Sequence, residues 1–144
     1  MKLDWNIIKI DDVTRIISFD IENLTSKVKG IDALCQTIVK RILTAKGSNQ
    51  FSSELGTNFF NLFGTINSNQ IESVKEIIPI LIDDLTSQIK NEQADSIISG
   101  ISLDAEEILD NILLEAIDFD KIFGGWIITL KIITKTTSKL ITVV

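Results

Sequence analysis

The chain has 144 residues, a length typical of one domain, and its 44% hydrophobic and 24% charged residues match a folded globular protein rather than a disordered one. Fourteen basic against twenty acidic residues give a formal net charge of -6, so phosphate backbones should repel the chain and a nucleic acid partner is not expected. No stretch reaches the ~20 apolar residues of a membrane span, and the start lacks the apolar run of a signal peptide. We therefore expect one soluble domain over residues 1–144, without membrane contact.

The N-terminal segment carries two short runs rich in β-branched residues, Asn6–Ile10 and Val13–Phe19, joined by Asp11 and Asp12. Such runs with a polar connection predict an N-terminal hairpin or an extended arm.

Between Ile31 and Ala45 the apolar residues recur every three or four positions, which predicts an amphipathic helix. Gly47 follows this pattern, and a glycine there is predicted to end the helix because it adopts left-handed backbone geometry without strain. Cys35 lies on the apolar side and is the chain's one cysteine, so it cannot form an internal disulfide. We expect a buried packing thiol rather than a reactive nucleophile.

Most of the phenylalanines fall within Ser48–Thr65, where we expect a loop followed by a short helix. Two interpretations stay open for these rings. They either fill the core or present aromatic anchors to a partner protein, because such side chains carry much of the binding energy of interfaces.

A longer helix should begin near Ser68, with Asn67 or Ser68 as its N-cap and an apolar stripe from Ile71 to Ile89. Pro79 removes one helical hydrogen bond and crowds the preceding turn, which predicts a kink or two abutting helices. The residues from 91 to 100 fit either a frayed helix end or a loop.

The last third predicts an antiparallel hairpin of two strands, Ile112–Phe119 and Trp126–Thr134, followed by a final strand, Leu140–Val144. Alternate residues of the second strand, from Trp126 to Ile132, are expected to share one buried face. The final strand is either an internal sheet member or an edge that accepts a strand of another subunit. The expected fold class is α+β, with an N-terminal hairpin or arm, three to four helices and a small C-terminal antiparallel sheet.

The chain contains no histidine, which removes the commonest general base and the commonest metal ligand, and one cysteine cannot build a thiolate zinc site. We therefore expect no metal, no cofactor and no enzymatic activity. Two carboxylate groups remain as candidates for a glycosidase pair. The first is Asp83 with Asp84, where a solvated helix face is favoured. The second comprises Asp104, Glu106, Glu107 and Asp110, and there Asp104 is predicted to be an N-cap with Glu107 as its capping-box partner.

Residues 31–44, followed by Lys46 and Gly47, resemble the first helix of the baseplate wedge, or sheath-initiator, family of contractile phage tails. Residues 51–64 resemble the aromatic loop, glycine and short helix that follow in that family, and Leu3–Trp5 and the two closing strands also fit. The family's Glu-Pro-Arg signature has no literal match here. The nearest segment is Asp104–Leu109, in which Glu106 or Glu107 takes the place of the family glutamate.

The resemblance implies a structural role in the virion, in several copies in a ring in the tail baseplate, assembled in the host cytoplasm. The implied partners are other wedge proteins and the tail sheath protein, with the tail tube as a further candidate. Sheath contact through strand addition is expected at Trp126, Ile128, Leu130, Leu140, Ile141 and Val143. Wedge contact is expected at Phe51, Phe59, Phe60, Phe63, Glu106 and Glu107.

Two alternatives come from other classes of protein. The family has also carried a lysozyme label, so the first is a peptidoglycan hydrolase that acts through Glu106 or Glu107 with a second carboxylate. The second is an adaptor domain without a viral context.

Overall fold

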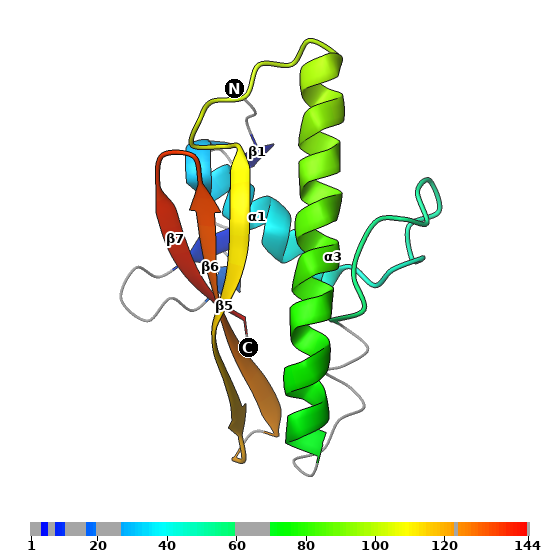
Figure 1. Ribbon diagram of the computed structural model, residues 1–144, viewed down its shortest axis with the longest axis vertical. Coiled ribbons are helices and arrows are strands. Elements are labelled where there is room, and N and C mark those ends of the chain that lie inside the picture. Colours follow the sequence, from blue (N-terminus) through cyan, green and yellow to red (C-terminus); the bar gives the residue numbers. More distant parts are fainter. Residues whose placement is uncertain are drawn as a thin grey trace.

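The computed structural model describes residues 4–5, 8–10, 17–19, 27–59, 70–122 and 124–143. Within them the fold is α+β, with helices α1 (Gly30–Leu43) and α3 (Ile71–Ile98) and a three-stranded antiparallel sheet. The sheet consists of β5 (Leu109–Asp120), β6 (Gly125–Thr134) and β7 (Ser138–Val143). In Figure 1 the sheet and α3 stand side by side, and α1 crosses behind them. The α+β class is thus confirmed, with two helices described. The short helix predicted to follow the loop within Ser48–Thr65 falls mainly on residues 60–65, outside the described residues.

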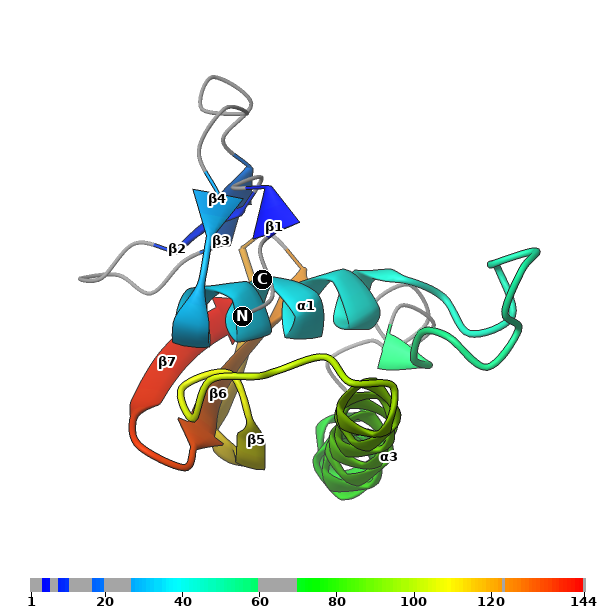
Figure 2. The same cartoon turned by 90° about the horizontal axis from the view of Figure 1, so that it is seen from above.

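Two pairs of short strands precede α1. β1 (Asp4–Trp5) pairs with β4 (Lys27–Val28), and β2 (Ile8–Ile10) pairs with β3 (Ile17–Phe19), both antiparallel. The residues that would connect β2 and β3 lie outside the described residues. Figure 2 shows β1 and β4 on the side of α1 that faces away from α3, so α1 lies in the middle of the molecule.

The first helix ends earlier than its sequence predicts. α1 stops at Leu43, and Thr44 is extended. The Thr44 hydroxyl donates to the Lys40 carbonyl at 2.6 Å, and Ala45 then forms a bridge with Thr57. This bridge is a non-local contact that draws the chain out of the helix before Gly47 is reached. The prediction that Gly47 ends the helix is therefore wrong.

The second helix is longer than predicted. α3 runs without a break for 28 residues to Ile98, with Pro79 inside it, so neither two abutting helices nor a loop at residues 91–98 is present. Pro79 is exposed, which leaves the Lys75 carbonyl open to water in place of its missing helical partner. Gln70 stands at the N-cap without a side-chain bond, and the predicted caps Asn67 and Ser68 lie outside the described residues.

The C-terminal hairpin is confirmed, and its first strand begins at Leu109 rather than Ile112. The β5–β6 register shifts at two points and skips Asp110 and Glu115, each of which is a β-bulge. The bulges keep five apolar side chains of β5 on one face although their spacing is uneven: Leu109, Ile112, Leu114, Ile117 and Phe119.

The core lies between this face of the sheet and the two helices. α1 contributes its apolar stripe, α3 contributes the predicted stripe from Val74 to Ile89, and β6 buries alternate residues from Trp126 to Ile132 as predicted. In the part of the chain that the structure describes, neither helix is long and apolar enough to cross a membrane.

Candidate functional site

The carboxylate of Glu107 lies at a junction between the start of α1 and the segment that enters β5. Its Oε1 accepts the backbone N–H of Gly30 at 3.4 Å, and its Oε2 accepts the backbone N–H of Asp104 at 3.1 Å. The Glu107 N–H donates in return to the Asp104 carbonyl at 2.8 Å. The hydrogen bond between the Glu107 side chain and the Asp104 N–H is the predicted capping interaction. The bond to Gly30 could not be predicted from the sequence around Glu107, because Gly30 is 77 residues away.

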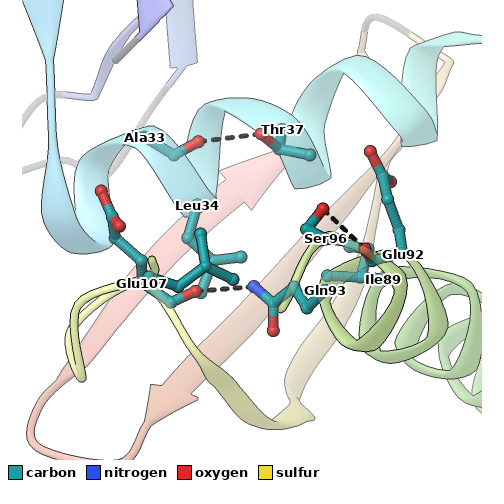
Figure 3. Close-up of a pocket in the computed structure, with 9 residues that line it drawn as sticks. Ala33, Leu34, Thr37, Ile89, Glu92, Gln93, Ser96 and Glu107 are labelled. Atoms are coloured by element: carbon teal, nitrogen blue, oxygen red, sulfur yellow. Dashed lines mark hydrogen bonds between the residues drawn. The ribbon is translucent and has the colours of Figure 1, made fainter. Parts of the chain in front are cut away.

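Gln93 of α3 holds the same segment through its side-chain amide. Its Nε2 donates to the Glu107 carbonyl at 2.6 Å, and its Oε1 accepts the Leu109 N–H at 2.9 Å. Figure 3 shows Gln93 reaching from α3 toward Glu107. The amide therefore forms the same pair of hydrogen bonds with this segment that the backbone of a neighbouring strand would form. Nothing in the polar stretch around Gln93 marks this role in the sequence.

A small cavity lies between α1, α3 and this segment (Figure 3), with Leu34, Gln93 and Glu107 among the residues that line it. Its volume of about 40 Å³ has room for very few water molecules. Ligand pockets usually measure about 300–1,000 Å³, so a sugar substrate does not fit here.

The other candidate carboxylates lie at the surface. Asp83 is exposed, and Asp84 accepts a bond from Gln88 at 3.0 Å and lies 3.7 Å from the Lys46 ammonium. Glu106 is exposed beside Gly30, where an added Cβ would come within 2.9 Å of its Oε2. Among the described residues, no cluster of three or more potential ligands is placed to hold a metal ion.

Cys35 is fully buried in α1, as predicted. Burial raises the pKa of its thiol from 9.0 to about 12, and the nearby Lys139 ammonium opposes this shift only in part. The thiol therefore stays protonated at neutral pH and acts as a packing group.

The residues predicted for sheath contact divide between the two faces of the sheet. Leu140 is half-buried on the outer face. The other five side chains are buried in the core: Trp126, Ile128, Leu130, Ile141 and Val143. A partner at this end of the chain would therefore meet the backbone edge of β7 or the outer face, and not these five side chains.

The aromatic residues predicted for wedge contact also differ in position. Phe59 is buried, with 1% of its surface exposed, whereas Phe51 is 99% exposed. Phe60 and Phe63 lie outside the described residues. Of the two glutamates, Glu107 is buried and Glu106 is exposed. Phe51 and Glu106 thus remain as accessible members of this group.

Phe51 stands on a loop, residues 44–58, that extends away from the body beside α3 (Figures 1 and 2). An open groove of about 630 Å³ separates part of this loop from α3. The Lys46–Asp84 pair links the loop to α3, and the Arg41–Glu92 pair links α1 to α3 in the same groove. The groove thus carries charges of both signs that are already partly neutralised.

Comparisons of this chain with protein-family models, with curated proteins and with solved structures find no match.

Proposed function

We propose that this protein is a structural component of the baseplate of a contractile phage tail, which binds wedge proteins and initiates sheath assembly by strand addition at the edge of β7. The observation that supports this most is the regular edge that β7 gives to the three-stranded sheet. The resemblance of residues 31–44 and 51–64 to the sheath-initiator family is the second support.

The opposite edge of the sheet, on β5, is poorly suited to strand addition. Bulges at Asp110 and Glu115 interrupt its regular spacing, and both residues are exposed carboxylates. Asp118 and Asp120 add two further negative charges along the same strand. Bulges and charged side chains are the features by which natural sheets prevent pairing at an edge.

The β7 edge has no bulge and a single charged residue. Its register with β6 is continuous from Ile133–Ser138 to Ile128–Val143, and its one charged residue, Lys139, is held by Asp32 of α1 at 2.8 Å. β3 approaches β7, but in the described residues no backbone ladder joins them. An added strand would therefore find a straight row of backbone donors and acceptors.

A deletion of residues 140–144 would not test this proposal cleanly. It would also remove Ile141 and Val143, which are buried in the core, so loss of sheath binding would follow from unfolding alone. A single proline is a sharper change because it removes one backbone N–H and keeps the strand in place.

Adjacent strand residues direct their N–H groups to opposite sides, so one of Lys139 and Leu140 donates away from β6. We expect one of the variants Lys139→Pro and Leu140→Pro to unfold close to its matched alanine variant and yet to fail to nucleate polymerisation of the purified sheath protein. The other should be less stable, because it breaks the β6–β7 ladder. If the proline variant of near-normal stability nucleates sheath as well as its alanine control does, strand addition at β7 is wrong.

A further inference from the structure

We infer that the loop of residues 44–58 is a second docking element, and that its exposed Phe51 inserts into an apolar, uncharged pocket of a wedge protein while β7 pairs with a different partner. The inference rests on the proposed function for the identity of the two partners. It adds the mode of binding, the anchor residue and the separation of the two surfaces.

The base of the loop is ordered by main-chain hydrogen bonds. The Thr57 N–H donates to the Thr44 carbonyl at 2.9 Å, and the Lys46 N–H donates to the Thr57 carbonyl at 3.2 Å. Gly56 has a φ of +99°, and a Cβ there would overlap the Thr44 carbonyl oxygen. The two ends of the loop are thus closed tightly against each other, as in compact Ω-loops, which are frequently functional.

The loop is also fixed to α3. The Gln88 side-chain amide donates to the Gly56 carbonyl at 3.2 Å, and the Lys46 ammonium lies 3.7 Å from the Asp84 carboxylate. Behind the loop, Phe59 is buried in the core. A loop that is ordered before binding loses less conformational entropy when it docks, which favours its use as an anchor.

The loop presents one exposed aromatic ring, on a segment without charged residues. The Phe51 N–H donates to Asn49 Oδ1 at 2.9 Å, which fixes the local turn, while the ring itself is 99% exposed. No charged residue occurs between Lys46 and Glu54. A ring this exposed gains free energy only by entering an apolar site, and the uncharged segment around it fits a pocket without charged groups.

Figures 1 and 2 both place this loop and β7 at opposite sides of the molecule, and in Figure 1 α3 and the rest of the sheet lie between them. A protein bound at Phe51 would therefore leave the β7 edge free. The chain can hold two different partners at once, as a bridge between wedge and sheath must.

The test begins with p-benzoyl-phenylalanine in place of Phe51, photo-crosslinked in phage-producing cells, with Ile98 as the matched control position because it is 83% exposed at the far end of α3. We expect one discrete adduct from position 51, to a protein other than the sheath subunit, and none of that adduct from position 98. No discrete adduct from position 51, or an adduct to the sheath subunit, would overturn the inference.

The crosslinked protein is then purified, and its Kd is measured for the wild-type chain and for Phe51→Ala, Phe51→Leu and Ile98→Ala. Loss of a central aromatic anchor should weaken binding by about 30-fold or more, with partial recovery for leucine and no change for Ile98→Ala.

The β7 proline variant should bind this protein like the wild type. Equal affinity of Phe51→Ala and wild type would refute the anchor, and loss of this protein by the β7 variant would refute the separation of surfaces. If sheath nucleation is independent of β7 but Phe51-dependent binding persists, the proposed sheath function falls while the docking loop stands.

Discussion

Replacing Glu107 with alanine should lower the free energy of unfolding by about 2–4 kcal/mol, because hydrogen bonds to charged groups contribute about 1.5–3 kcal/mol each. The carboxylate accepts backbone N–H groups from Gly30 and Asp104, and the first of these lies 77 residues away in the chain. The bond to Gly30, at 3.4 Å, is long and contributes at the lower end of that range.

The Gly30 N–H, which the Glu107→Ala variant would leave without its acceptor, sets the smallest loss of stability that we expect. Without the carboxylate, the Gly30 N–H at the start of α1 would have to take water from the adjacent cavity of about 40 Å³, which has little room for it. Glutamine at position 107 keeps the shape but loses the charge and directs one N–H₂ group at a donor. We therefore expect Glu107→Gln to fall between wild type and alanine.

Urea unfolding followed by far-ultraviolet circular dichroism measures these differences. Glu106→Ala is the matched control, because Glu106 is the exposed neighbour of the same charge and should change stability by less than about 0.5 kcal/mol. If Glu107→Ala stays within about 0.5 kcal/mol of the wild type, or if Glu106→Ala costs as much as Glu107→Ala, the junction does not stabilise the fold as argued.

Three further changes probe other parts of the molecule. Gly56→Ala should displace the loop from Thr44, because the added Cβ would overlap the Thr44 carbonyl oxygen. We expect a marked loss of Phe51-dependent affinity in the same binding assay and only a small decrease of the midpoint in thermal unfolding. Leu130→Ala should cost about 2–5 kcal/mol in urea unfolding, because Leu130 is fully buried in the central strand. Cys35 should react with a thiol reagent at pH 8 only after urea unfolds the chain. Because the pKa of this thiol rises from 9.0 to about 12 on folding, stability should fall as pH rises above about 9, where only the unfolded thiol ionises, and a Cys35→Ala variant should lose that part of the pH dependence.

The sequence predicts the central strand best, because the bulges lie on its neighbour β5 and the alternation of buried and half-buried residues along β6 is unbroken from Trp126 to Thr134. Its neighbour β5 was predicted three residues too short at its start. The bulge at Asp110 breaks the period of two, so Leu109 looks out of phase although it lies on the same inner face as Ile112.

The ends of the helices could not be predicted because distant contacts decide them. The bridge to Thr57 draws the chain out of α1 at Thr44, three residues before Gly47, where local rules place the end of the helix. Pro79 does not divide α3, because its exposed position lets water replace the lost hydrogen bond and the buried stripe continues on both sides.

The candidate site was predicted in part. The capping role of Glu107 follows from a spacing of three residues, which a sequence shows. Its bond to Gly30 and the exposure of Phe51 as against the burial of Phe59 depend on tertiary packing, which the sequence does not show. For the same reason the alternation that identified β6 as a strand could not say which side chains a partner would reach.

The position of β7 also governs the order in which the molecule can fold. α1 is completed by contacts that arrive late, since Lys139 of β7 pairs with Asp32 across 107 residues of chain. The β5–β6 hairpin is local and can form first. Until β7 is synthesised and docks, the edge of β6 that later pairs with β7 stays unpaired, and Leu130 and Ile132 lack the packing of the β7 side chains. A ribosome-bound or truncated chain that lacks β7 would therefore expose a hydrophobic strand edge, the kind of surface that chaperones bind and that aggregates form on.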